Sequence, residues 1–157
     1  QTCALPISRI AGGILARETE GDLIQAAKDI LLFVLGVALG KYGGNILKYQ
    51  EIVGKIADIA ILTFGMESAW LRAQKAVTRD GEDTARLKLN MAEVSVNTAI
   101  STVYNLAREI LAFVDEGEEL IKKLYELQEL CQYTPSNTIT IRQEIAAAVT
   151  TAAKYTV

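Results

Sequence analysis

The chain has 157 residues, which is enough for one domain, and half of them are hydrophobic, so a sizeable core can form. Its formal net charge is −3 with a sequence pI near 5.1, which argues against a general nucleic-acid binder and a binder of anionic membranes. It contains no histidine, so the commonest general base and the commonest metal ligand of proteins are both missing.

The first residues have a character of their own. The run QTCALPI is what the end of a common sequencing-adapter DNA encodes in this reading frame, and the chain has no initiator methionine. We therefore interpret Gln1–Ser8 as adapter-derived and exclude it from the fold. Residues 9–20 are then a lead-in, and residues 21–157 form the domain. With Cys3 set aside, Cys131 is the remaining cysteine, so no disulfide framework is expected and a reducing cytoplasm is the natural compartment.

The first predicted helix runs from about Asp22 to Lys41, after a capping box formed by Thr19 and Asp22. Its middle, residues 30–40 (ILLFVLGVALG), is apolar on every side. Eleven residues are too few for a bilayer core, which needs roughly 20. A buried central helix is therefore favoured over an interfacial membrane helix, which would need a strong polar face.

A long second helix is predicted from Asn45, its N-cap, to Arg79, and at 1.5 Å per residue it would be roughly 50 Å long. Apolar residues recur in steps of three and four, which predicts one packed face. That face comprises Ile46, Tyr49, Val53, Ile56, Ala57, Ala60, Phe64, Leu71 and Ala73 or the neighbours of Gln74.

The polar turn around Gly81 predicts that a third helix, from about Asp83 to Asp115, folds back antiparallel to the second. Its expected apolar stripe is Leu87, Met91, Val94, Thr98, Val103, Leu106, Ile110 and Phe113 or Val114. The middle of this helix is more polar, and those side chains either hydrogen-bond across a helix interface or face water. They are Asn97, Ser101, Thr102 and Asn105.

Two shorter helices complete the prediction. One runs from about Glu118 to Gln132, with Leu120, Ile121, Leu124, Leu127, Leu130 and Cys131 apolar. After a loop at Pro135, the other runs from Thr138 or Thr140 to Lys154, with Ile141, Ile145, Ala148 or Val149 and Ala152 on its apolar face. The fold class is therefore all-α, a bundle of four to five helices around a long central antiparallel helix hairpin.

Candidate chemistry is sparse. Asp58 and Glu67 are nine residues apart, or about 13 Å along a helix, so ion pairs with Arg72 or a lysine of a neighbouring helix are favoured over a catalytic pair.

A di-metal carboxylate site would use Glu-x-x-His, and no histidine exists. No histidine can activate Cys131 either, so a buried apolar thiol is expected. The pair Lys122-Lys123 is interpreted as solvated surface. No catalytic, cofactor-binding or metal residue is predicted.

A family resemblance is carried by several short runs, with a matching closing stretch from Tyr133 to Tyr155. The runs are Lys41-Tyr42-Gly43, Gln50-Glu51-Ile52-Val53, Ala57-Asp58-Ile59, Phe64-Gly65-Met66-Glu67-Ser68-Ala69 and Leu71-Arg72. Over about Ile14 to Val157 the chain resembles the C-terminal extension of the larger, very-long-chain-like bacterial acyl-CoA dehydrogenases. These residues form a packing signature and not a catalytic one.

The resemblance implies a parent flavoprotein of fatty-acid β-oxidation. In that family a glutamate takes a proton from the acyl-CoA, FAD takes the hydride, and electron-transferring flavoprotein reoxidises the cofactor. These groups belong to an upstream core, so the fragment itself is expected to be inactive and without cofactor, with FAD in the parent enzyme. Its implied role is to pack on that core and shape a dimer, and the candidate packing segments are Ile30–Gly40 and Glu67–Arg72.

A second hypothesis is a free-standing helical interaction module without enzymatic activity, whose apolar faces bind a partner helix. The reading frame upstream of Ser8 distinguishes the two hypotheses. A nearby start codon favours the module, whereas an open frame favours the dehydrogenase tail. In either case, the acidic charge balance predicts no nucleic-acid partner and little or no membrane contact.

Overall fold

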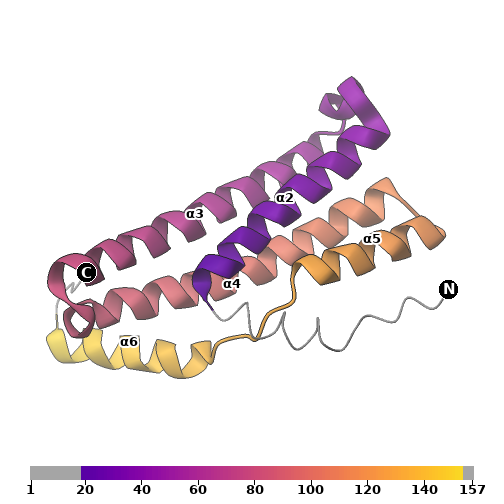
Figure 1. Ribbon diagram of the computed structural model, residues 1–157. Helices are drawn as coiled ribbons and strands as arrows, with labels where there is room; N and C mark the ends of the chain where they lie inside the picture. Colours follow the sequence, from indigo (N-terminus) through magenta and orange to yellow (C-terminus); the bar gives the residue numbers. More distant parts are fainter. Residues whose placement is uncertain (1–18, 154–157) are drawn as a thin grey trace.

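The computed structural model describes residues 19–153, which form an all-α bundle (Figure 1). In that range the helices are α2 (Glu20–Tyr42), the 3-10 helix η1 (Gly43–Lys48), α3 (Gln50–Asp80), α4 (Glu82–Val114), α5 (Gly117–Leu130) and α6 (Thr138–Ala152). The described residues contain no strand, so the predicted fold class is confirmed. The adapter interpretation of residues 1–8, and most of the lead-in, lie outside the described residues.

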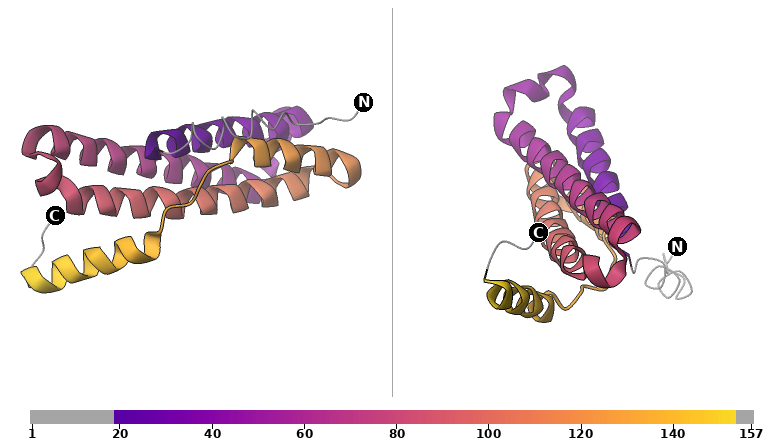
Figure 2. Two further views of the ribbon diagram at one scale, coloured as in Figure 1. Left: turned by 60° about the horizontal axis from the view of Figure 1, so that its bottom comes forward. Right: turned by 90° about the vertical axis from the view of Figure 1, so that its left-hand side faces the viewer.

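A hairpin of α3 and α4 forms the long axis of the molecule, as predicted (Figure 1). The two helices meet at Gly81, whose φ of +84° is a conformation that other residues seldom adopt. Helix α2 packs across both, and α5 returns along the second half of α4. Helix α6 lies at the edge of the bundle, against the first half of α4, at the end of an extended connection (Figure 2).

The core lies where α2, α3 and α4 meet, and α5 closes it with one buried side chain. Burial of large aliphatic side chains there supplies the main driving force for folding. The largest fully buried side chains are Ile30, Val34, Ile59, Met66, Val96, Ile100, Val103, Ile110, Leu111 and Leu127. Helix α4 contacts all four other α-helices, so it is the central element of the bundle.

The predicted packed face of the second helix is only partly right. Ile46 and Ala73 are buried, and Val53 and Ile56 are partly buried against the core. Phe64 is 72% exposed and Leu71 is 59% exposed. The buried side chains of α3 are Ile52, Ile59, Thr63, Met66, Ala73 and Ala76, and of these only Ala73 is in the predicted face. Ile59 and Phe64 are separated by about 140° around the helix at 3.6 residues per turn. Helix α3 therefore has apolar side chains on two opposite faces, and their spacing alone does not reveal which one is inside.

The predicted stripe of α4 is partly right. Val103, Ile110 and Val114 are buried as expected, whereas Thr98 and Phe113 are exposed. Small residues form much of the interface of α4 with α2 and α3, because they allow these helices to approach closely. The buried side chains that the prediction left out are Ala85, Ala92, Val96, Asn97, Ile100, Ala107 and Leu111.

The start of the second helix also differs from the prediction. Asn45 is not its N-cap, because residues 43–48 form η1 and α3 begins only after Tyr49. Tertiary contacts explain the turn, since Ile46 is 8% exposed and the Tyr42 and Tyr49 rings lie 4.2 Å apart between centroids. The predicted capping box of α2 is confirmed: the Asp22 N–H donates to Thr19 Oγ1 at 3.3 Å, and the Thr19 N–H donates to the Asp22 carboxylate at 3.4 Å.

Helix α2 is buried on one side only. Ile30, Val34 and Ala38 are fully buried, whereas Leu32 is 66% exposed and Leu39 is 45% exposed. Among the described residues, the segment Glu20–Lys48 is the one stretch long and apolar enough to cross a membrane by length and composition, a test that core helices also pass. The buried side of α2 agrees with the predicted central helix, and the exposed side is an apolar surface that requires explanation.

Candidate docking surfaces and the polar seam

Four of the exposed apolar residues of α2 and α3 lie on one face. Lys28 of α2 forms a 2.6 Å salt bridge with Glu67 of α3, which places both side chains on the same side of the helix pair. This is the structural ion pair with a neighbouring lysine that the sequence predicts for Glu67. Leu32 follows Lys28 by four residues, and Leu71 follows Glu67 by four, so each lies beside the bridge on its own helix.

By the same spacing, Phe64 precedes Glu67 by three residues, and Leu39 follows Leu32 by seven. We call this surface the α2–α3 face, and it comprises Leu32, Leu39, Phe64 and Leu71. Each of the four side chains is between 45% and 72% exposed. Water contact with so many large apolar side chains on neighbouring helices is typical of a surface that another protein segment covers.

The two predicted packing segments contribute to this face in different ways. In residues 30–40, Ile30 and Val34 are used inside the domain and only the outward leucines remain available. In residues 67–72, Glu67 is engaged with Lys28, Trp70 packs against the core and Leu71 points outward. Only one side of each segment is therefore free to contact anything further.

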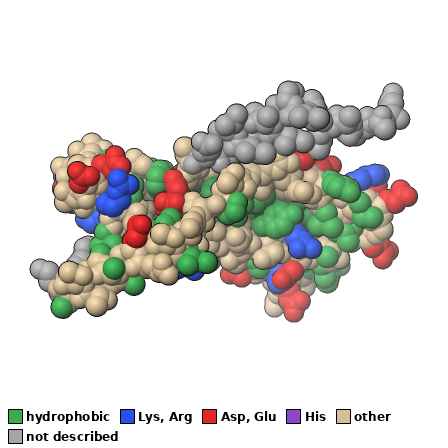
Figure 3. Space-filling view, turned by 90° about the horizontal axis from the view of Figure 1, so that it is seen from below, with side chains coloured by type: hydrophobic (Ala, Val, Ile, Leu, Met, Phe, Trp, Pro, Cys, Tyr) green, Lys and Arg blue, Asp and Glu red, His purple; other side chains and the backbone are tan. Residues whose placement is uncertain are grey.

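A second apolar surface lies over α5, where hydrophobic side chains gather among charged ones (Figure 3). Ile121 and Tyr125 are 54% and 67% exposed there, and with Tyr104, Leu124, Arg108 and Gln128 they line a shallow cavity of about 280 Å³. Because charged residues interrupt this surface, it is less continuous than the α2–α3 face.

A polar seam joins α4 to the loop before α6. The Ser136 N–H donates to Asn97 Oδ1 at 3.2 Å, and the Asn97 amide donates to the Glu93 carbonyl oxygen at 3.0 Å. Ser101 Oγ and the Tyr133 hydroxyl are 3.4 Å apart. Of the two alternatives left open for the polar residues of this helix, Asn97 and Ser101 therefore bond across elements, whereas the Thr102 hydroxyl donates to its own helix at the Thr98 carbonyl.

Helix α6 has no fully buried side chain and is held to α4 largely by polar contacts. An Arg142 guanidinium N–H donates to Thr98 Oγ1 at 2.9 Å, and the Asn90 amide donates to the Glu144 carboxylate at 3.0 Å. The Thr140 N–H donates to Asn137 Oδ1, which caps the helix. Its expected apolar face is only partly buried at Ile141 and Ile145, and Val149 is exposed.

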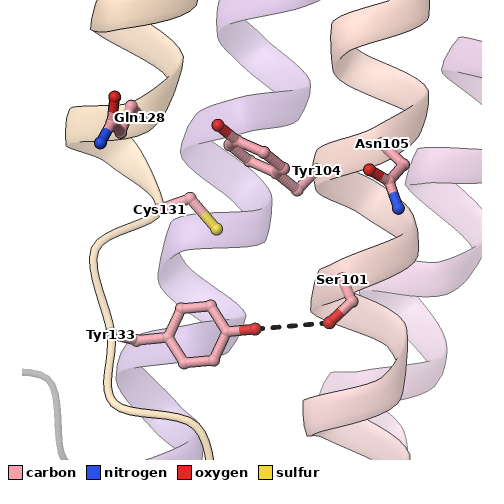
Figure 4. Close-up of a pocket in the computed structure, with 6 residues that line it drawn as sticks. All are labelled: Ser101, Tyr104, Asn105, Gln128, Cys131 and Tyr133. Atoms are coloured by element: carbon pink, nitrogen blue, oxygen red, sulfur yellow. Dashed lines mark hydrogen bonds between the residues drawn. The ribbon is translucent and has the colours of Figure 1, made fainter.

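The seam continues into a cavity of about 230 Å³ between α4 and the end of α5 (Figure 4). Its lining residues are Ser101, Tyr104, Asn105, Gln128, Cys131 and Tyr133, and none of them is acidic, basic or histidine. Cys131 is partly exposed there, which corrects the expectation of a fully buried thiol. A nucleophile needs a neighbouring base, and this lining offers none. Among the described residues, no group of three potential metal ligands comes together.

Asp115 ties three helices together where α4 ends. Its carboxylate accepts from Lys123 Nζ of α5 at 2.7 Å and from Lys41 Nζ of α2 at 3.5 Å. The hydrogen bond from Lys123, strengthened by the charges of both lysines, lowers the pKa of Asp115 below its ordinary value of 3.8. The carboxylate is therefore favoured in its charged form by folding.

We expect Asp115→Asn to lower the free energy of unfolding by about 1 kcal/mol at pH 7, because both charge-assisted bonds are weakened. A carboxyl whose pKa is lowered by folding stabilises the protein above its unfolded pKa, and that contribution is lost as the pH falls. Urea denaturation of the two proteins at pH 7 and pH 3 measures this, and their difference should shrink below about pH 3.8. A difference that stays constant with pH would show that the charge of Asp115 is not what stabilises the helix junction.

Comparisons with known proteins place this helical architecture in a family. Residues 26–129 match the family model of the acyl-CoA dehydrogenase C-terminal domain. A probable acyl-CoA dehydrogenase of Bacillus subtilis (strain 168) is 39% identical over 140 residues, which cover 89% of this chain. The crystal structure of an acyl-CoA dehydrogenase complexed with FAD from Bacillus anthracis superposes with a TM-score of 0.85 at 38% identity over 88% of this chain.

The chain therefore belongs to the acyl-CoA dehydrogenase C-terminal domain family, which confirms the resemblance found in the sequence. It spans about a quarter of the length of these relatives, because the matches cover 24% of each.

Proposed function

We propose that this chain is the C-terminal helical domain of an FAD-dependent acyl-CoA dehydrogenase of fatty-acid oxidation, and that it acts by packing on the catalytic core of that enzyme. The observation that carries the proposal is the exposed α2–α3 face on a domain whose relatives are about four times as long as the match. The remaining three quarters of such a chain provide the natural cover for that face. A homodimer in the cytoplasm is part of the same proposal.

The separate roles that we propose for the catalytic core and for this domain follow from the side chains of the domain. In the parent enzyme, FAD accepts a hydride from the β carbon of the acyl-CoA after a carboxylate removes the α proton. In this chain, Glu67 is neutralised by Lys28, and Asp58 is exposed on the same helix. We therefore assign no residue of the chain to the chemistry. Its residues supply a rigid apolar surface that holds the core in place and excludes water from the contact.

A chimera tests this function. The last quarter of the Bacillus subtilis relative is replaced by residues 19–157 of this chain, and a truncated version without that quarter serves as the control. We expect the chimera to be soluble, to retain FAD and to oxidise acyl-CoA at a rate similar to that of the intact relative. We expect the truncated control to aggregate or lose FAD, because its docking surface is uncovered. A truncated enzyme that is as soluble and active as the intact relative would contradict the proposal.

A further inference from the structure

A cavity of about 550 Å³ lies near the turned end of the α3–α4 hairpin. Its lining comes from residues 69–79 of α3 and residues 88–92 of α4. The apolar lining consists of Ala69, Ala73, Ala76, Met91 and Ala92, and the cationic lining consists of Arg72, Lys75, Arg79 and Lys88. We call this cavity the basic groove.

The small apolar residues make the floor of the groove. Ala73, Ala76 and Ala92 are at most 6% exposed, so they fill the contact between α3 and α4. Single methyl groups leave the centre of the groove shallow, whereas the four cationic side chains are long enough to rise around it. The groove therefore combines a closed apolar base with a positively charged rim.

The charge of the rim is only partly compensated, because Asp80 is the acid near it and attracts Arg79 and, at longer range, Lys88. Arg79 forms a 2.6 Å salt bridge with Asp80, but Arg72, Lys75 and Lys88 form none within residues 19–153. Elsewhere in the described residues most lysines do pair with carboxylates; they are Lys28, Lys41, Lys55, Lys122 and Lys123. Because the chain has a net charge of −3, the lack of an acidic residue in the lining of the groove does not follow from composition.

This arrangement has an electrostatic cost that an anion would relieve. Lys75 and Arg79 are four residues apart on α3, where like charges repel, and Lys88 faces them from α4. An arginine guanidinium offers a planar pair of N–H donors that suits phosphate oxygens, and lysine ammonium groups add point charges. Convergence of these donors from two helices gives a rigid frame, because α3 and α4 are packed against each other along their length.

We propose that the basic groove binds a phosphate-bearing anion, with Arg72, Lys75 and Lys88 as its ligands. This inference goes beyond the packing function and does not depend on it. The phosphate group belongs either to a soluble phosphate ester or to a lipid headgroup, since both offer the same oxygens.

The test uses the isotope-labelled 157-residue chain and inorganic pyrophosphate as the probe, at constant ionic strength, followed by amide chemical shifts. We expect saturable shifts confined to residues 69–79 and 88–92. The double variant Lys75→Gln, Lys88→Gln should weaken binding by about tenfold or more, since each charge-assisted bond contributes roughly a factor of ten. Lys48→Gln, Arg108→Gln removes the same charge away from the groove and should change the affinity less than about twofold.

A parallel arm measures flotation with vesicles of phosphatidylcholine, with and without phosphatidylglycerol. Pyrophosphate binding without flotation supports a soluble phosphate ester, and flotation that requires Lys75 and Lys88 supports a lipid headgroup. Circular dichroism confirms that the variants fold, and the single variant Arg72→Gln provides a second probe of the rim. Shifts that do not saturate, or that both double variants reduce equally, would overturn the proposal.

Discussion

Replacing Ile100 with alanine is expected to lower the free energy of unfolding by about 2–5 kcal/mol, the range for removing a large aliphatic side chain from a packed core. Ile100 is fully buried near the middle of α4, the helix that contacts α2, α3, α5 and α6. The cavity left behind cannot close easily, because helices on several sides hold α4 in place. Urea denaturation followed by circular dichroism at 222 nm, the usual helix wavelength, measures the change.

A matched control lies two residues away on the same helix. Thr102 is exposed and its hydroxyl bonds only to the carbonyl of Thr98 within α4. Thr102→Ala should leave the stability within about 0.5 kcal/mol of the parent, because alanine is the better helix former at an exposed position. Equal effects of the two substitutions would show that α4 is not the centre of the core.

The sequence predicts the number and order of the helices well, because local signals mark their ends. The Thr19 capping box, the glycine at position 81 and the proline at 135 each act within a few residues. It fails where tertiary contacts decide. Ile46 and the Tyr42–Tyr49 ring contact convert the expected first turn of the second helix into η1, and nothing in the pattern around Asn45 signals this.

The wrong assignment of two large residues to the packed face of α3 has a more informative cause. Phe64 and Leu71 do belong to an apolar stripe of helical spacing, but that stripe lies on the α2–α3 face and is exposed. A periodicity argument assumes that one face is buried within the domain, whereas a helix that packs on two neighbours has two such faces. The exposure of Phe64 and Leu71 therefore helps to locate the surface that we propose to contact the catalytic core.

The candidate sites can be predicted only in part from the amino-acid sequence. Asn97 and Ser101 could be singled out as polar residues in a central helix, but their partners Ser136 and Tyr133 lie beyond a whole helix and a loop. The basic groove was missed because Lys88 joins Arg72 and Lys75 only through the hairpin. Lys75 lies six residues before Gly81 and Lys88 seven after it, so pairing residues at similar distances from the turn would have brought these two cations together.

The second large effect is expected at the α2–α3 face. In the chimera with the Bacillus subtilis relative, the double variant Leu32→Glu, Phe64→Glu should weaken docking on the core by more than about 100-fold, because two carboxylates would be buried without partners. The isolated chain should fold as before, since both side chains are mostly exposed. Loss of FAD and of solubility in the chimera, with an unchanged circular dichroism spectrum of the isolated variant, is the expected pair of results.

Ile121→Glu is the matched control, because Ile121 is also exposed and apolar but lies on α5 among charged neighbours. It should leave the FAD content of the chimera unchanged if the α2–α3 face is the one that docks. If Ile121→Glu disrupts the chimera and the double variant does not, the core packs against α4 and α5 instead. Leu32 and Leu39 of α2 would then have to be buried against a different partner. The second subunit would be the first candidate, since a homodimer is part of the proposed assembly.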